Sequence, residues 1–419
     1  MKLLSQFLRY ASSTFLLPQL LAPVRAHRHP ARAQIPTHSA LLAWILGFVA
    51  RVHSREELGR LLDRPALHRL TGRHISADSL ARIAAQLDHD SLRTQLLVPL
   101  IRRMRRNKLW SPGSVGPFVM VAIDGSEPFH TPHRHCAACL SRTRADGQTE
   151  YYHRVVVASI VGTHPRILLD LEPVQRGESE VAAAGRLVDR LANAFPWVHV
   201  FLLDAGFAQG PFLAQIDRLG RGFIVRVKDQ ERRLLLRDAQ ALAARSQPAR
   251  WVTSWGHRRL RVQAWDEDHF TSWDSYPGAL RVLIVDEEEL PEPATRRRQT
   301  PFPGRLRPRA FYATNLSPGQ LPTRALWEAA HHRWNLENTG FHQLKHEFHW
   351  NHPFAHQSPE ALLSTWLLLA VAFNLFLTFV YRRLRMARQG EKPARWFAGE
   401  LYAALRVAPA ELLPYLAAG

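Results

Sequence analysis

Three acidic residues stand in sequence contexts that could support metal-dependent chemistry. Asp124 ends the apolar run FVMVAID and Asp204 ends the apolar run VHVFLLD, and a glycine follows each of them within two residues. Functional side chains collect at the strand ends of open α/β sheets. Glu337 comes from a third stretch, whose apolar residues have the spacing of a helix. Taken one at a time, either aspartate is more simply explained as a turn-forming residue at the end of a strand.

The set of three carboxylates predicts a site for hard divalent cations. Oxygen donors without a cysteine or histidine set favour Mg²⁺ or Mn²⁺ over zinc. Two such ions about 3.5–4 Å apart can activate a water or a 3′-hydroxyl and stabilise the leaving oxygen of a phosphodiester. Glu127 and Asp170 are rival acids near the predicted sheet edge, but neither has the strand-then-glycine context. We therefore expect Asp124, Asp204 and Glu337 to be the catalytic metal ligands.

The stretch around Glu337 predicts one continuous helix, from residue 323 to residue 348. Four aromatic residues recur along it every seven positions, namely Trp327, Trp334, Phe341 and Phe348. At about 100° per residue, Arg333, Glu337 and Lys345 fall on the same side as these rings. A buried lone carboxylate costs several kcal/mol, so Glu337 should be paired or metal-bound. The alternative is a surface salt bridge between Arg333 and Glu337, four residues apart, worth about 0.2–0.5 kcal/mol.

A second cluster of metal-binding residue types lies in the segment HTPHRHCAACLSR. It holds both cysteines of the chain, Cys136 and Cys139, with His133 and His135 beside them and His153 on the next predicted strand. These residues could bind a structural zinc ion. A single Cys-x-x-C pair is a weak signal, however. The simpler interpretation is a loop with reduced thiols and histidines that face DNA.

The composition indicates a polyanionic partner and a reducing compartment. The 419 residues include 55 Lys and Arg against 36 Asp and Glu, a formal net charge of +19. Such a field attracts nucleic acid or an anionic membrane surface. Two cysteines are too few for a disulfide framework, so we expect a cytoplasmic protein.

Two apolar segments could instead indicate export or a membrane. Residues 1–26 resemble a signal peptide, but Arg9, Pro18 and Gln19 interrupt the apolar run. Residues 361–381 are long enough to cross a bilayer. Ser364, Thr365, Asn374 and Thr378 dilute this second segment, so we expect a helix buried in the protein core and no membrane partner.

The order of predicted elements indicates an α/β protein with a mixed sheet and helical ends. Residues 1–112 form a helical region, either a helix-turn-helix-like DNA-binding module or a plain bundle. Residues 113–229 read as three strands, helix, strand, helix and strand. Residues 230–310 form a β-rich insertion, in which ALRVLIV is a candidate neighbour of RAFYATNL. Residues 311–385 return to the core, and residues 386–419 are a basic, partly helical tail.

Three blocks of this chain resemble the acidic motifs of insertion-element DDE transposases that carry a β-rich insertion before the glutamate. The blocks are FVMVAIDGSE, LLDAGF and RWNLENTGFHQLK, and LEPVQRGESEVAAAGRLVDRL between the two aspartates is also similar. The resemblance covers roughly residues 115–380. It implies an RNase H-like core, two divalent metal ions, and metal-dependent cleavage of element ends followed by strand transfer into target DNA.

The resemblance also implies roles for individual residues. Asp124, Asp204 and Glu337 would be the metal ligands, and Arg333 and Lys345 would contact DNA phosphates. The chain departs from the family pattern at two positions. Many relatives have tyrosine where this chain has Ala330, and their lysine follows the glutamate by seven residues, where this chain has Leu344 and places Lys345 one position later.

Two other function classes are alternatives to a transposase. One is an RNase H-like nuclease that cuts DNA without joining it, and the other is a DNA-binding descendant of a transposase with an inactive site. We expect a homodimer on DNA, because two element ends must be brought together.

Overall fold

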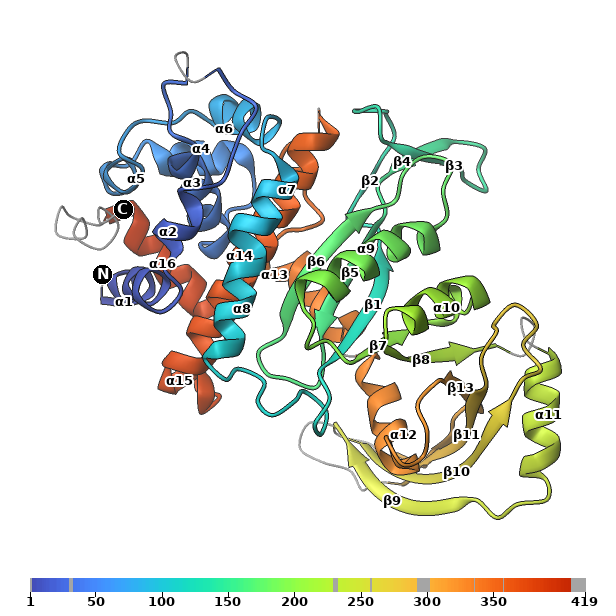
Figure 1. The fold of residues 1–419 in the computed structure, drawn as a ribbon. Helices are drawn as coiled ribbons and strands as arrows, with labels where there is room; N and C mark the ends of the chain where they lie inside the picture. Colours follow the sequence, from blue (N-terminus) through green and yellow to red (C-terminus); the bar gives the residue numbers. More distant parts are fainter. Residues whose placement is uncertain are drawn as a thin grey trace. The chain divides into compact units, whose positions relative to one another are not determined.

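Figure 1 shows the computed structural model of the chain, which describes residues 2–29, 33–228, 233–256, 258–291, 302–334, 336–356 and 358–407. Within these ranges the side chains of residues 66, 233 and 337–339 are not described. The chain forms two compact units. The first unit is made of Met1–Ser114, Asp124–Pro196 and Asn335–Gly419, and the second of Val115–Ile123 and Trp197–Trp334.

The first unit begins and ends with helices, as predicted. Its N-terminal elements are α1 (Lys2–Arg9), η1 (Tyr10–Thr14), α2 (Leu17–Leu21), α3 (Thr37–Val49), α4 (Arg55–Leu62), α5 (Pro65–Thr71), α6 (Ala77–Ala84), α7 (His89–Ser91), η3 (Leu92–Leu97) and α8 (Val98–Arg106). Its C-terminal elements are η5 (Leu336–Phe341), α13 (His342–Glu347), α14 (Pro359–Arg383), α15 (Arg385–Arg388) and α16 (Ala394–Val407). Two of these helices have serine N-caps, since Ser54 accepts from the Glu57 amide and Ser76 from the Ser79 amide.

Helix α14 is the central helix of the first unit. It packs against α3, α6 and β6, and Phe379 on it meets Phe7 of α1 edge-on at 5.4 Å. By length and composition this helix could cross a membrane, but 94% of its most apolar window is buried inside the protein. That burial agrees with the predicted core helix, and a core helix passes the same test of length and hydropathy.

The strands of the first unit form a hairpin and a small separate sheet. β5 (Val155–Ile160) pairs antiparallel with β6 (Ile167–Pro173), and α9 (Glu180–Ala194) packs on both. The small sheet has the order β2-β4-β3, with β2 at His130–Thr131, β4 at Thr149–Tyr152 and β3 at Leu140–Thr143.

The second unit is built on one mixed sheet. Its strand order is β1 (Met120–Ser126, whose last three residues belong to the first unit), β7 (Val200–Leu203), β8 (Gly222–Val227), β13 (Ala310–Thr314), β11 (Leu280–Glu289), β10 (Arg258–Phe270) and β9 (Ala249–Trp255), while β12 (Arg305–Leu306) pairs with β11. β1, β7 and β8 are parallel, and the strands from β13 to β9 are antiparallel. The predicted pairing of ALRVLIV with RAFYATNL is confirmed, since Arg281 lies opposite Thr314.

Among its described residues, the second unit has four helical elements: η4 (Ala205–Phe207), α10 (Gly210–Arg218), α11 (Arg233–Ala243) and α12 (Thr323–His332). α10 and α12 pack on β8, and α11 packs on β10 and β11 (Figure 1). The strands β9 to β12 fall within the predicted β-rich stretch. The mixed sheet, the helices packed on it and the helical ends confirm the predicted α/β fold class and are consistent with an RNase H-like core.

The stretch predicted as one helix from residue 323 to residue 348 is helical over most of its described residues, but the helical type changes along it. α12 ends at His332, the π-helix η5 begins at Leu336, and α13 follows. The aromatic stripe is broken as well, because Trp334 is 37% exposed while Trp327 and Phe348 are buried. A π-helix bonds residues five apart, so a spacing of seven no longer returns to one face.

Candidate active site

Asp124 is positioned by strand β1. Its Oδ1 accepts a hydrogen bond from the Gly125 amide at 2.9 Å, and its side chain is half-buried. The glycine turn predicted after Asp124 is absent, because β1 continues to Ser126. A methyl group at Gly125 would overlap the carboxylate of Glu180, so close packing explains why glycine stands here.

Asp204 follows strand β7 directly and begins the short 3₁₀-helix η4. Its carboxylate is 42% exposed. β1 and β7 run parallel with Ile123 opposite Leu203. Ile123 and Leu203 are thus paired across the two strands, and Asp124 and Asp204 are the next residues after them.

Arg333 lies beside Asp204 in the second unit. Its Nη2 is 3.9 Å from Oδ1 of Asp204, its side chain is only 7% exposed, and its guanidinium lies over the ring of Trp334 at 4.8 Å. A buried guanidinium next to a carboxylate makes a fixed positive site that suits phosphate oxygens. The carboxylate remains open enough for a cation.

Glu287 on β11 holds the helix that leads to Arg333. Its carboxylate accepts hydrogen bonds from Nε1 of Trp327 at 2.6 Å and pairs with Nε2 of His331 at 2.8 Å and Nη1 of Arg307 at 2.7 Å. Burial alone would raise the pKa of Glu287, but these three partners outweigh it and lower the pKa to about 2. The ionised Glu287 therefore anchors α12 to the sheet.

Glu337 and Lys345 belong to the first unit. Glu337 lies in η5, and its side chain is outside the described part of the structure. Lys345 lies in α13 and is half-buried. Burial lowers the pKa of the Lys345 ammonium, and the nearby Glu127 carboxylate partly opposes this shift.

The two rival acids are engaged in ion pairs. Glu127 accepts from Nη1 of Arg142 at 2.9 Å and Nη2 of Arg154 at 2.5 Å. Asp170 is buried on β6, where it pairs with Nε of Arg93 at 3.1 Å and Nε of Arg190 at 2.9 Å. For each acid, such a pair of arginine partners is typical of a structural ion-pair network.

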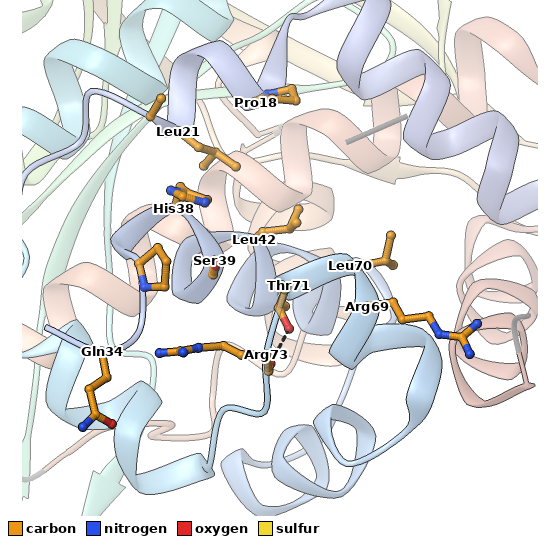
Figure 2. Close-up of a pocket in the computed structure, with 13 residues that line it drawn as sticks. Pro18, Leu21, Gln34, His38, Ser39, Leu42, Arg69, Leu70, Thr71 and Arg73 are labelled. Carbon is orange, nitrogen blue, oxygen red and sulfur yellow. Dashed lines mark hydrogen bonds between the residues drawn. The ribbon is translucent and has the colours of Figure 1, made fainter. Parts of the chain in front are cut away.

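A pocket in the N-terminal helices offers different chemistry. Figure 2 shows its lining, which comes from α2, α3, α5 and the segments next to them. Arg69, Arg73 and His38 are its ionisable side chains, and none of the lining residues is an acid. This pocket could accept an anion or an apolar group, but it has no carboxylate for a hard metal ion.

The family model for the transposase DDE domain matches residues 120–375, which is more than half of the chain. The chain belongs to the DDE transposase family. No curated protein matches it. The matched range includes Asp124, Asp204 and Glu337, and it confirms the family that the three acidic blocks resemble. DNA is the partner of such a transposase, and enzymes of this family generally use divalent metal ions.

The Cys/His segment of the transposase folds into a cluster that the sequence indicated only in part. Cys136, Cys139 and His153 come together with His356, and all four side chains are buried. His133 and His135 are exposed and lie outside this cluster, although the His135 ring is 4.7 Å from that of His356. Burial lowers the pKa of His153 to about 4, and burial with neighbouring histidines does the same for His356, so both imidazoles are neutral near pH 7.

His356 is the site residue that sequence reasoning missed. It lies in the segment between α13 and α14, 217 positions from Cys139. His349 and His352 precede it there, and His352 and His356 have the H-x3-H spacing of zinc ligands. This spacing was the signal available in the sequence, but the long separation hid its relation to the Cys-x-x-C pair, and the structure brings only His356 of the two histidines into the cluster.

Proposed function

We propose that this transposase catalyses metal-dependent cleavage at the ends of an insertion element and transfers the freed 3′-hydroxyl into target DNA. The observation that carries the proposal is the register pair Ile123–Leu203, since the acids Asp124 and Asp204 come next on neighbouring parallel strands. The position of Arg333 beside Asp204 supports a site that handles phosphate.

The proposed metal ligands are Asp124, Asp204 and Glu337. Asp204 is partly exposed and Asp124 is half-buried, so both carboxylates suit Mg²⁺ or Mn²⁺, which prefer oxygen ligands and retain waters. Two bound ions would supply activation of the attacking oxygen and stabilisation of the leaving oxygen.

The proposed DNA contacts are Arg333 and Lys345. Arg333 would hold a phosphate by its rigid guanidinium, and Lys345 would act as a point charge. A net charge of +19 gives a general attraction to DNA. We also propose a cytoplasmic protein that acts as a homodimer on DNA, because two element ends must meet.

The test is cleavage and joining of a duplex that carries the element's own end, with Mg²⁺ or Mn²⁺ present. We expect the wild-type chain to cut and join, and Glu337→Gln and Asp204→Asn to bind the duplex but do neither. Glu328→Gln is the matched control, because Glu328 is an exposed acid on α12 paired with Arg324. It should keep full activity.

Each other outcome would contradict a defined part of the proposal. Full activity of Glu337→Gln would remove Glu337 from the ligand set. Cutting without joining would indicate an RNase H-like nuclease, and binding without cutting under any divalent metal would indicate an inactive descendant. Light scattering of the complex with element ends tests the dimer.

A further inference from the structure

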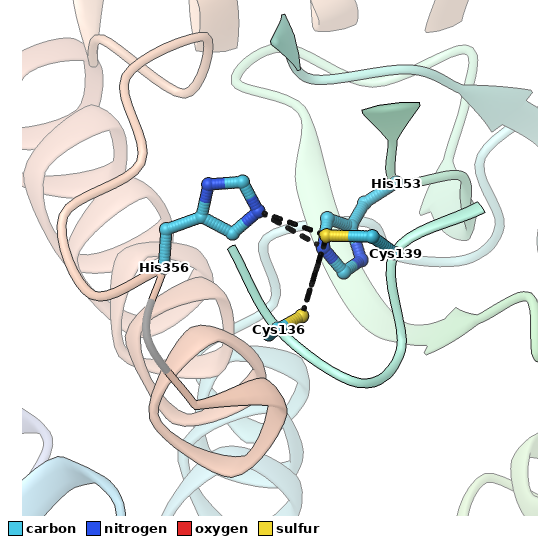
Figure 3. Close-up of side chains that lie close together, drawn as sticks. All are labelled: Cys136, Cys139, His153 and His356. Atoms are coloured by element: carbon cyan, nitrogen blue, oxygen red, sulfur yellow. Dashed lines mark hydrogen bonds between the residues drawn. The ribbon is translucent and has the colours of Figure 1, made fainter. Parts of the chain in front are cut away.

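Four buried side chains of the first unit converge on one point (Figure 3). Their nearest contacts are 3.6 Å between Sγ of Cys136 and Cys139, 3.4 Å and 3.5 Å from Nε2 of His153 to these two sulfurs, 3.5 Å from Nε2 of His356 to Sγ of Cys139, and 3.2 Å between the two Nε2 atoms. All four ligand atoms lie within 4.8 Å of one another.

These separations match the edges of a tetrahedron around a zinc ion. With Zn–S of about 2.3 Å and Zn–N of about 2.0–2.1 Å, the edges are about 3.8 Å for S–S, about 3.6 Å for S–N and about 3.3 Å for N–N. The five separations given above all fall within a few tenths of an ångström of these values. We propose that one structural Zn²⁺ ion is bound here by four side chains: Cys136, Cys139, His153 and His356.

The donor set selects zinc and separates this site from the catalytic metal ions. Thiolate sulfur and imidazole nitrogen are soft or borderline ligands that suit Zn²⁺, whereas Mg²⁺ takes oxygen. Four protein ligands close the coordination sphere and leave no position for a reacting water. The ion is therefore structural, and the inference does not depend on the catalytic proposal.

Two simpler explanations of the cluster fit the structure less well. A disulfide requires an S–S distance of about 2.05 Å, whereas the two sulfurs are 3.6 Å apart and both cysteines are free. A metal-free cluster would leave two thiols and two imidazoles buried mainly against each other. Sulfur is a weak hydrogen-bond partner, so such burial is unfavourable.

The surroundings of the cluster are apolar on several sides. The ring of Phe129 lies 4.7 Å from that of His356, and the ring of Trp366 on α14 lies 6.1 Å from that of His153. The exposed fractions of the four ligands run from 0% for Cys139 to 8% for His356. A low-dielectric, water-poor shell strengthens the attraction between Zn²⁺ and thiolates.

The ion would join three segments that are distant in the chain. The cysteines lie in the turn between β2 and β3, His153 directly follows β4, and His356 lies between α13 and α14. Zinc would link the segment from η5 to His356 with the small sheet β2-β4-β3. That segment includes Glu337. Metal binding would thereby stabilise the folded first unit.

The test is the zinc content of the purified full-length chain, expressed with zinc in the medium and measured by mass spectrometry of the metal. We expect one zinc per chain in the wild type, and loss of this zinc in Cys139→Ser and His356→Gln. His135→Gln is the matched control, since its ring neighbours His356 but lies outside the cluster. His356→Cys should retain the ion, because it replaces one zinc ligand with another.

A second measurement uses the wild type alone, so it does not depend on whether variants fold. After the metal is removed, added Co²⁺ should produce the visible absorption bands of a tetrahedral site with thiolate ligands. Wild-type protein without zinc and without this spectrum would overturn the proposal. So would unchanged zinc in Cys139→Ser, or a Cys136–Cys139 disulfide in place of bound metal. DNA cleavage is not a readout here, so failure of the catalytic proposal would be seen separately.

Discussion

The buried guanidinium of Arg333 lies 3.9 Å from the partly exposed carboxylate of Asp204. Glu287 fixes the preceding helix through Trp327 and His331, and Arg333 follows directly after that helix. Asp204 is thus a carboxylate with one cationic neighbour and one open side. The arrangement suits a phosphate that bridges an arginine and a carboxylate-bound cation.

Replacing Arg333 by glutamine should weaken binding of the element end about tenfold or more, because a charge-assisted hydrogen bond contributes about 1.5–3 kcal/mol. The slope of log K against log salt should fall by about 1, as expected for one lost phosphate contact. Fluorescence anisotropy over a salt series measures both. Arg324→Gln is the control, because Arg324 is exposed on the same helix and pairs with Glu328. An unchanged salt slope in Arg333→Gln would make its role purely structural.

Alanine at Gly125 should destabilise the fold by up to about 1 kcal/mol, because its methyl group would displace the flexible end of Glu180 and weaken its partly exposed ion pair with Arg154. Gly206 stands in the corresponding position after Asp204, where an added methyl meets no described atom within 4 Å. Gly206→Ala should therefore stay within about 0.5 kcal/mol of the wild type. Urea unfolding followed by circular dichroism compares them.

The double variant Gly125→Ala, Glu180→Ala identifies the cause of the effect. If the carboxylate is the obstacle, the double variant should recover part of the stability that Gly125→Ala loses. Equal losses in Gly125→Ala and Gly206→Ala would show that packing against Glu180 is not the reason for glycine at position 125.

The ion pairs of Glu287 predict a loss of stability in acid. Its pKa is lowered from 4.5 to about 2 in the folded chain, so its stabilisation is complete above pH 4.5 and disappears as the pH falls to about 2. The difference amounts to about 3 kcal/mol. Glu287→Gln should be less stable at neutral pH and should lose this part of the pH dependence, measured by urea unfolding between pH 5 and 2. Glu288→Gln, at an exposed neighbouring position, should follow the wild-type profile.

Leucine at Asn374 should destabilise the first unit by about 3 kcal/mol. The Asn374 amide accepts from the Leu168 amide at 2.9 Å and donates to the Leu168 carbonyl at 2.8 Å, all within the core. Leucine would leave both backbone groups buried and unpaired, at about 1–3 kcal/mol each. Unfolding in urea gives the difference.

Thr378→Val is the comparison on the same helix. The Thr378 hydroxyl is buried, and no described residue is its hydrogen-bond partner. Valine has nearly the same shape and removes an unsatisfied polar group, so stability should be unchanged or higher. A larger loss in Thr378→Val than in Asn374→Leu would contradict this account of the helix.

Local patterns in the sequence were sufficient for much of the fold. The apolar runs before Asp124 and Asp204 predicted β1 and β7, and the helix starts at Ser54 and Ser76 have the capping residue type that such starts favour. These features depend on residues close together in the sequence, so the period of the apolar residues and the capping residue types can be identified from the sequence alone. The length and composition of residues 361–381 likewise predicted a buried helix.

Periodicity failed where the backbone changes its helical type. A spacing of seven suggested one helix through Glu337, but the chain ends α12 at His332 and continues as a π-helix. The aromatic residues on either side are buried in different units: Trp327 packs on Trp251 and Trp255, while Phe348 packs on Phe373. The aromatic residue of α12 is buried in the core of the second unit, and that after α13 is buried in the core of the first unit. The spacing of aromatic residues in the sequence does not show which unit buries each of them.

The sequence by itself indicated the strands before Asp124 and Asp204, the helical ends, the three acidic blocks and a basic chain that suits DNA, but it missed β2, β3 and α11. Only the tertiary structure decided that Ile123 lies opposite Leu203, that Arg333 stands beside Asp204, and that His356 completes the Cys136, Cys139 and His153 cluster. The physical reason is the range of the interactions. Periodicity and capping act between residues a few positions apart, whereas His153 and His356 meet across 203 positions, which only the packing of the whole unit can bring about.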